Sequence, residues 1–358
     1  MFYAILAILS FGFLIASHEA GHMFAAKAFG VKVNEYAIGM GPALFSKQKG
    51  ETKYSLRLFP IGGYCAIEGE TGNSNDPRAL CSQAVWKQIV VFAAGVTVNF
   101  LTGFLILLIT YMTAAAIVTP DIAYLDPAFP YQGESGLKIG DTIRSINGRK
   151  VLLHSDVALL LMIEGDTDDG AVTFGIERDG ELLNREIKKT TYVREDGSEY
   201  KAYGISYGGT IPATLGSKLK YTWLNTVDLV RIIWLNLEVI VTGKVSTDDV
   251  MGPIGIVSEM TQLGQESEAT NGVSGAISDV MYFVALIAVN LAVVNLLPIP
   301  ALDGGHIVIL LLDALFLKLF HKKMSLKVVN AVSLASFVVV LALMAVISWH
   351  DIARLVAS

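Results

Sequence analysis

The chain of 358 residues has little charge and almost no cysteine: 17% of its residues are Asp, Glu, Lys or Arg, and 53% are hydrophobic. This balance argues against a wholly water-soluble protein. Cys65 and Cys81 form no CxxC pair and are too few for a disulfide scaffold. The net charge of −6 offers no basic surface, so no nucleic-acid partner is expected. Internal repeats and low-complexity segments are also absent from the sequence.

Long uncharged stretches are what the sequence has instead, at residues 1–17, 89–118, 281–302 and 328–349. A helix through the first would reach about 25 Å, at about 1.5 Å per residue, into an apolar bilayer core of about 30 Å. A cleaved signal peptide is the alternative there, but no basic segment precedes the stretch and no small-residue cleavage site closes it. We expect a polytopic α-helical membrane protein with about four transmembrane helices, whose partner is the lipid bilayer.

The basic residues between these stretches predict the sidedness. Eight lie between the first and second stretches and four between the third and fourth: Lys27, Lys32, Lys47, Lys49, Lys53, Arg57, Arg78 and Lys87, then Lys318, Lys322, Lys323 and Lys327. Because cytoplasmic loops carry the excess of Lys and Arg, both connections are expected in the cytoplasm. The N- and C-termini, and the long segment 119–275, are then expected on the extracytoplasmic face.

The segment 119–210 has the pattern of a small, mostly β domain. Residues 171–177 alternate in polarity, and Asp-Gly pairs at 169–170, 179–180 and 196–197 are typical of hairpin turns. Residues 216–243 look helical, but five charged side chains interrupt them, which favours a helix lying in the membrane interface. Residues 31–67 predict a membrane-associated β-hairpin ending in Pro60-Ile61-Gly62-Gly63-Tyr64. We therefore expect four segments: 1–118, 119–210, 211–275 and 276–358.

The first stretch ends in His18-Glu19-Ala20-Gly21-His22, which fits the pattern H-E-x-x-H. Two histidines at i and i+4 share one helical face and can both bind Zn²⁺, while the adjacent Glu can act on a bound water. Charged and polar residues inside an apolar helix are costly unless paired or metal-bound, so they indicate function. The alternative is a cluster at the level of the lipid headgroups.

A catalytic zinc site needs a third protein ligand, and Asp303 is the preferred candidate. It ends the run from Asn295 to His306, in which two prolines remove helical donors and two glycines permit close backbone approach. Such a break at membrane depth is tolerated only where protein or a water cavity satisfies it. His306 could also be a ligand, or a partner of one, and the ligand types would also suit iron, cobalt or manganese.

The paired motifs at 18–22 and 295–304 resemble those of the site-2 protease family, membrane-embedded zinc metalloproteases, in the bacterial subgroup with a PDZ domain. Phe59 to Tyr64 is similar to the family's hairpin near the active site, and residues 252–256 to the segment before its third core span. Residues 136–141 and 146–148 are similar to its PDZ signature. The resemblance covers nearly the whole chain and implies a bacterial plasma-membrane protein with an extracytoplasmic PDZ-like domain.

The resemblance also implies roles for individual residues. His18, His22 and Asp303 would bind Zn²⁺, and Glu19 would be the general base. Substrate backbone would be held by residues from three elements, namely Asn290 and Asn295, the hairpin residues Gly62, Gly63 and Tyr64, and Asn99. Asn99 fits only partly, because Val96 stands where the family usually has proline. For all three asparagines the alternative is interhelical hydrogen bonding.

The expected function is intramembrane cleavage of single-span membrane proteins, such as a membrane-tethered anti-sigma factor or a signal-peptide remnant, after their outer domain has been trimmed. The PDZ-like domain would act as the gate or, alternatively, as a spacer, and the sequence does not specify its ligand. A membrane-bound PDZ scaffold with a structural metal site is the second hypothesis, against which the intact Glu19 speaks. A metal transporter is the third, and it usually shows paired halves that this sequence lacks.

Overall fold

The computed structural model describes residues 1–70, 72, 74–165, 170–194, 197–241, 251–322 and 324–357. The chain forms two compact units, one of Met1–Leu107 with Leu229–Ser358 and the other of Leu108–Asp228. The second is wider than the expected segment 119–210, since it also takes in the end of one long helix and the first half of another.

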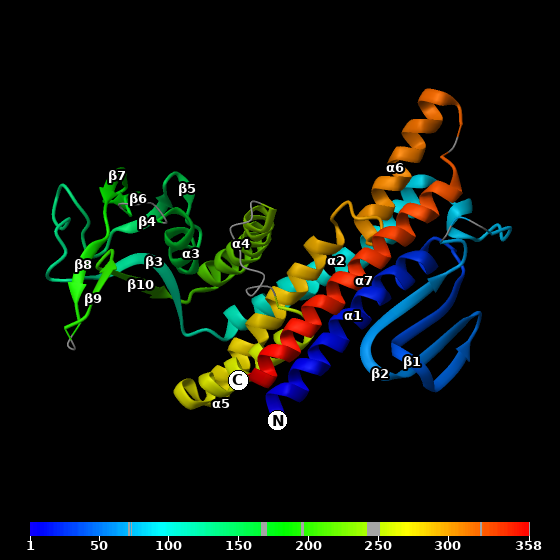
Figure 1. Ribbon diagram of the computed structural model, residues 1–358, viewed down its shortest axis with the longest axis horizontal. Helices are drawn as coiled ribbons and strands as arrows, with labels where there is room; N and C mark the ends of the chain where they lie inside the picture. The colour runs from blue at the N-terminus through cyan, green and yellow to red at the C-terminus, as the bar shows by residue number, and fades with distance from the viewer. Residues whose placement is uncertain are drawn as a thin grey trace. The chain divides into compact units, whose positions relative to one another are not determined.

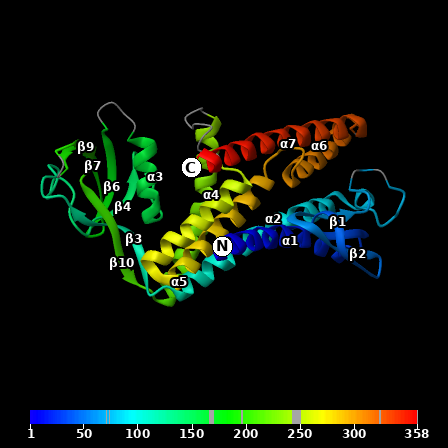
Figure 2. The same cartoon turned by 60° about the horizontal axis from the view of Figure 1, so that its bottom comes forward.

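The first unit is built on four long helices (Figures 1 and 2): α1 (Phe2–Ala28), α2 (Val85–Thr113), α5 (Pro253–Asn295) and α7 (Leu326–Ala357). Each is long and apolar enough to cross a membrane, which confirms the expectation of four such helices. Helix α5 packs against both α1 and α7. Helices α1, α2 and α5 share a core of small and aliphatic side chains, among them Ala7, Leu14, Leu107, Val284 and Ala288. The start of α1 and the end of α7 lie at the same end of the unit.

Two of the four helices end earlier than the uncharged stretches predicted. Helix α2 ends at Thr113, and residues 116–118 belong to a strand, since Pro120 disfavours a helix at the residue before it. Helix α5 ends at Asn295 rather than at 302 and contains a break at Gly272 (φ 72°, ψ 176°). Its 43 residues would reach about 64 Å, whereas residues 273–295 alone reach about 34 Å and match the bilayer core.

Helix α6 (Asp303–Phe320) was not predicted from the sequence. It begins where the third uncharged stretch ends, and Asp303, Asp313 and Lys318 interrupt its apolar residues. A search for uncharged runs therefore passes over it. A short 3₁₀ helix (Leu80–Ser82) precedes α2.

The predicted β-hairpin is confirmed, with strands β1 (Val33–Lys49) and β2 (Thr52–Ile67). Residues 35–38 of β1 lie opposite residues 66–63 and also opposite residues 53–56 of β2. The first part of β1 is thus the centre of a small sheet, and residues 63–67 form one of its edges. The sheet packs against α1, and the Tyr36 hydroxyl donates a hydrogen bond to the Ala16 carbonyl (2.8 Å).

The second unit is mainly β, as expected. A six-stranded sheet has the order β10-β3-β4-β6-β7, with β5 paired to β4, and β8 pairs with β9. The elements are β3 (Ala116–Leu125), β4 (Thr142–Ile146), β5 (Arg149–Lys150), α3 (His154–Glu164), β6 (Val172–Arg178), β7 (Glu181–Ile187), β8 (Thr190–Val193), β9 (Glu199–Ala202) and β10 (Ile205–Pro212).

One turn of this unit was predicted residue by residue. Asp179 (φ 53°) and Gly180 (φ 84°) connect β6 to β7, as a two-residue hairpin turn with two positive φ angles requires. Asp169 and Asp196 of the other two predicted turns lie outside the described residues.

The helix predicted at 216–243 is confirmed as α4 (Leu215–Val241), and residues 242–243 lie outside the described part of the chain. Helix α4 is not among the helices apolar enough to span, as its charged residues predict. Its location in the membrane interface stays a prediction.

Helix α5 is capped from the far end of the chain. The buried carboxylate of Asp351, on α7, accepts hydrogen bonds from the backbone N–H groups of Gly252 (3.2 Å) and Gly255 (2.8 Å). A Cβ at either glycine would lie within 2.8 Å of this carboxylate, so only glycine permits the approach. The segment 252–256 thus serves here as a helix start.

Candidate metal centre

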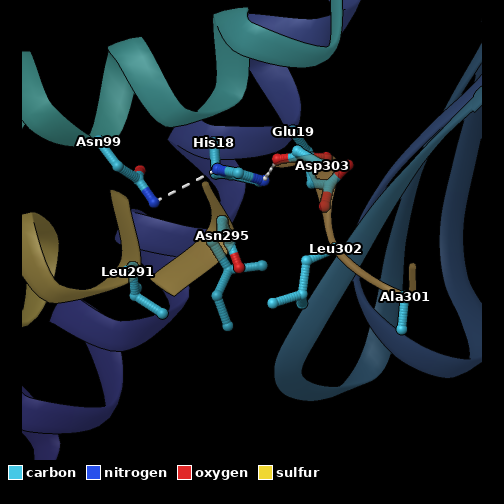
Figure 3. A pocket seen from close by; sticks show the side chains of 9 residues that line it. His18, Glu19, Asn99, Leu291, Asn295, Ala301, Leu302 and Asp303 are labelled. Atoms are coloured by element: carbon cyan, nitrogen blue, oxygen red, sulfur yellow. Dashed lines mark hydrogen bonds and ion pairs between the residues drawn. The ribbon is translucent and has the colours of Figure 1, made fainter. Parts of the chain in front are cut away.

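His18, His22 and Asp303 converge in the first unit, although Asp303 lies far from the histidines in sequence. Figure 3 shows His18 beside Asp303. Asp303 Oδ2 is 3.2 Å from His18 Nε2 and 3.5 Å from His22 Nε2. The two Nε2 atoms are 3.2 Å apart. Within the described residues, these three side chains form the one group of His, Cys, Asp and Glu with metal-ligand spacing.

The arrangement fits a tetrahedral divalent cation. Zn²⁺ with ligands at about 2.0–2.1 Å separates neighbouring ligand atoms by about 3.3 Å, close to the three distances in the structure. Asp303 Oδ2 is buried and accepts no hydrogen bond, although unpaired buried carboxylate oxygens are costly. Both histidines are more than nine-tenths buried. A cation among the three ligands would satisfy all of these groups.

The contact between α1 and α2 sets the histidine rings. His22 Nδ1 donates to the Val91 carbonyl (2.8 Å), which leaves the lone pair of its Nε2 directed at Asp303. The rings lie over Gly95, where a Cβ would come within 2.3 Å of His22 Nε2 and 2.8 Å of His18 Cε1. Gly21 provides the matching close approach, since its Cβ would lie 2.7 Å from the Ala94 carbonyl oxygen.

Asp303 is delivered by a non-helical connection, residues 296–302, which links α5 to the first residue of α6. This connection folds back over Gly304 and Gly305, where Cβ atoms would lie within about 2 Å of the Leu296 and Ile299 carbonyls. His306, the alternative ligand, stacks its ring on Phe92 (centroids 4.8 Å apart, 5° between planes). The structure therefore brings Asp303, and not His306, to the two histidines.

A cavity of about 270 Å³ opens beside the three side chains. Glu19 and Asn295 line it together with Asn99, whereas Leu291 and Leu302 form its apolar wall, as Figure 3 shows. The residues that line it are Ile15, His18, Glu19, Asn99, Leu291, Asn295, Ala301, Leu302 and Asp303. A partly polar cavity next to a candidate cation site is suited to holding a peptide bond.

Of the predicted substrate-binding residues, Asn99 and Asn295 line the cavity and the others do not. Asn290 lies on α5 but does not line the cavity, and Tyr64 directs its hydroxyl to Arg57. Gly63 lies against the catalytic helix, since its Cβ would be 3.7 Å from Glu19 Cγ. Gly62 (φ 88°) instead faces the side chain of Met40.

The hairpin also contacts Glu19 directly. The backbone N–H of Cys65 donates a hydrogen bond to the Glu19 carboxylate. Because Tyr36 holds the same sheet to Ala16, one turn before Glu19, the hairpin and the HExxH helix meet at two points.

Sequence reasoning missed several of these supporting groups. Gly95 and Gly21 matter through the side chain they lack, and the Val91 carbonyl and Cys65 N–H are main-chain groups that no residue type marks. One signal was present, because small residues in adjacent apolar helices mark close helix contacts.

The comparisons with known proteins agree with this geometry. The model of Peptidase family M50 matches residues 6–343. A protein of Clostridium acetobutylicum, provisionally named a zinc metalloprotease, is 33% identical, and the match covers 98% of this chain and 97% of that protein. The Regulator of sigma-W protease RasP of Bacillus subtilis is 27% identical, with 97% of each chain covered. The zinc metalloprotease RasP of Shouchella clausii is likewise 27% identical over 97% of this chain and 98% of its own. The resemblance to the site-2 proteases is thereby confirmed, and the chain belongs to Peptidase family M50.

Proposed function

We propose that this chain is an intramembrane zinc endopeptidase that cleaves single-span membrane proteins. The observation that carries the proposal is the convergence of His18, His22 and Asp303, beside Glu19, on a cavity inside a bundle of membrane-length helices. A membrane-tethered anti-sigma factor is one substrate that fits, since a similar protein is named a regulator of sigma-W protease. A signal-peptide remnant is another.

His18 Nε2, His22 Nε2 and Asp303 Oδ2 would hold the zinc ion. Bound there, zinc would supply Lewis-acid activation of a water and of the scissile carbonyl. Glu19 accepts the proton of the attacking water at its carboxylate and passes it to the leaving nitrogen. Cys65 N–H keeps that carboxylate beside the cavity, and Leu291 and Leu302 exclude bulk water from its far wall.

We propose that the edge formed by residues 63–67 receives the substrate as an added strand. A peptide bond in a transmembrane helix must be unwound before attack, because every carbonyl in that helix is already hydrogen-bonded. Strand addition replaces these bonds without demanding a particular sequence. Since Cys65 N–H points away from β1 toward Glu19, the period of two puts the free main-chain groups of Gly63 on the same edge.

Proline at this edge tests strand addition. Gly63→Pro removes an N–H group and should suppress cleavage while zinc content stays normal. The φ of 88° at Gly62 cannot be adopted by proline, so Gly62→Pro, which should also suppress cleavage, distorts the strand as well. Cleavage at the wild-type rate by Gly63→Pro would exclude strand addition.

The site is expected nearer the cytoplasmic face. His18 precedes Lys27 by nine residues, or about 14 Å of helix, and Val91 follows Lys87 by four, or about 6 Å. These lysines stand at the basic end of the bundle, which the positive-inside rule puts in the cytoplasm. The start of α1 and the end of α7, which lie together at one end of the unit, would then be extracytoplasmic.

We propose that the β-rich second unit is a PDZ-like domain that admits only trimmed substrates. Strand β10 is an edge of its sheet, and a groove of about 320 Å³ lies beside it. Deletion of residues 124–208 tests the gate. The new junction joins paired strands, since Ile122 lies opposite Tyr207 and Thr119 opposite Gly209. Gating predicts that the deletion variant cleaves untrimmed substrate, whereas a spacer predicts no such cleavage.

The central experiment measures zinc content and cleavage of a model single-span substrate, for wild type and for Glu19→Gln. We expect about one zinc in both proteins and cleavage within the span by wild type alone. If both proteins bind zinc and neither cleaves several such substrates, a scaffold with a structural metal site is the better description. If neither holds a metal, the site itself is wrong.

A further inference from the structure

Asn99 lines the cavity and also lies against the ring of His18. It lies on α2, is 1% exposed, and its Nδ2 is 3.4 Å from His18 Nδ1 (Figure 3). Its Oδ1 is buried and has no hydrogen-bond partner. A buried amide with one atom unpaired, and with the other facing a ring nitrogen, calls for a physical explanation.

The tautomer of His18 supplies one. Its Nε2 lies 3.2 Å from Asp303 Oδ2 and 3.2 Å from His22 Nε2, at the centre of the trio. A neutral imidazole that offers Nε2 to a metal carries its proton on Nδ1, which is therefore a donor. An Asn NH₂ group opposite a donor makes no hydrogen bond.

Exchanging the oxygen and nitrogen of the Asn99 amide removes the conflict. The two orientations differ by a half turn and have the same shape, so only the hydrogen-bond network distinguishes them. In the exchanged orientation Oδ1 takes the place beside His18 Nδ1 and accepts a hydrogen bond from its N–H group. His22 already has such an acceptor, because its Nδ1 donates a hydrogen bond to the Val91 carbonyl. Both histidines would then be oriented by acceptors on α2, namely the Val91 carbonyl and the Asn99 side chain eight residues further along.

We infer that Asn99 is a positioning residue that accepts a hydrogen bond from His18 Nδ1 and thereby fixes the ring for metal binding. This inference rests on the proposed zinc site and differs from a substrate-binding role. A substrate contact would change KM or kcat and leave the metal affinity alone. Loss of an acceptor behind a ligating histidine lowers the metal affinity itself, typically about 10–100-fold.

The test measures the zinc dissociation constant of the full-length protein in detergent, by competition with a chromogenic chelator. Asn99→Leu removes the acceptor at similar size and should weaken zinc binding about 10–100-fold, whereas Asn99→Asp keeps an acceptor and should bind at least as tightly as wild type. Asn99→Ser, whose shorter side chain cannot reach Nδ1, should weaken binding like Asn99→Leu. It serves as the second variant if the apolar change impairs folding.

Asn295→Leu is the matched control, because Asn295 lines the same cavity but contacts none of the three ligands in the described hydrogen bonds. Its zinc affinity should equal that of wild type, and the absorption spectrum of its Co²⁺-loaded form should be unchanged. Wild-type affinity in Asn99→Leu and Asn99→Ser, or equal weakening in Asn99→Asp, would overturn the inference. Absence of zinc from wild type would instead overturn the proposed function.

Discussion

Helix α1 meets two neighbours at its HExxH segment, and the two contacts serve different parts of the same chemistry. On one face, α2 supports the histidines through Gly95 and the Val91 carbonyl. On the other, the β-hairpin supports Glu19 through the N–H of Cys65 and holds α1 through Tyr36. The comparison predicts that metal affinity and turnover are separable: substitutions in the α2 contact should release zinc, and substitutions in the hairpin contact should leave zinc bound but slow cleavage.

The largest effect is expected from His22→Ala, which removes a ligand and its hydrogen bond to α2. Zinc content, measured by mass spectrometry of the purified protein, should fall from about one per chain to near zero, and cleavage should be undetectable. His306→Ala is the control, because His306 stacks on Phe92 outside the trio. Loss of zinc from this control as well would reopen the choice of third ligand.

Gly95→Ala should be nearly as severe, although it changes no ligand. Its Cβ would lie 2.3 Å from His22 Nε2, so the rings must move, and the zinc affinity should fall by about 10–100-fold or more. Gly103→Ala on the same helix is the matched control, since its Cβ would meet Val289 (2.7 Å) rather than the site. The chelator competition should show normal affinity for this control, even if its thermal stability drops.

Cys65→Pro should separate turnover from metal binding on the hairpin side. Proline removes the backbone N–H group that donates a hydrogen bond to Glu19. An edge strand tolerates proline where the lost N–H group points away from the sheet. We expect kcat to fall about 100-fold, within the range of general-base effects, at unchanged zinc content. Cys65→Ser, which keeps the N–H, should retain most of the activity. Equal loss in both variants would assign the effect to the side chain.

Tyr36→Phe should have a smaller effect of the same kind. It removes one hydroxyl hydrogen bond, worth about 1 kcal/mol, and should lower kcat about five- to tenfold without releasing zinc. Thiol labelling at pH 8 provides a second readout. Burial, with lesser contributions from nearby carboxylates, raises the pKa of Cys65 to about 12, so its thiol should react slowly in wild type. Faster labelling of Cys65 in Tyr36→Phe would show that the hairpin has loosened from α1.

The smallest effect concerns the hairpin alone. Burial alone would raise the pKa of Glu35. Hydrogen bonds from Ser55, Tyr64 and Arg57, together with the charge of Lys53, outweigh this effect and lower the pKa to about 2. The folded pKa thus lies below that of an unfolded Glu, about 4.3. Ionised Glu35 therefore stabilises the hairpin above about pH 4, and this contribution is lost as the pH falls towards 2.

Pepsin digestion between pH 2 and 5 measures that loss. Cleavage within residues 33–67 should accelerate below about pH 4 in wild type, and Glu35→Gln should remove this step while zinc content at neutral pH stays normal. An unchanged step in Glu35→Gln would assign it to another carboxylate.

The sequence predicted features that depend on residues close together in the chain better than features that depend on remote contacts. His18, Glu19 and His22 are fixed by spacing along one helix, and the turn at Asp179-Gly180 by local backbone preference, so both were readable. Asp303 required a remote pairing, which the broken helix and the family resemblance supplied. Two contacts were not readable, since Gly95 acts through an absent Cβ and Cys65 through its backbone. Asn99 was named from the family resemblance as a substrate-binding residue, but its contact with His18, 81 residues away, was not foreseen. Helix α6 was missed because its charges hide it from a search for uncharged runs.

The Asp351 carboxylate has a consequence for biosynthesis. It caps the first turn of α5, yet it is made 99 residues after Gly252. During translation, the first N–H groups of α5 can therefore pair with this carboxylate only after α7 has been made. This contact between α5 and α7 can thus form only after His18, His22 and Asp303 have all been synthesised.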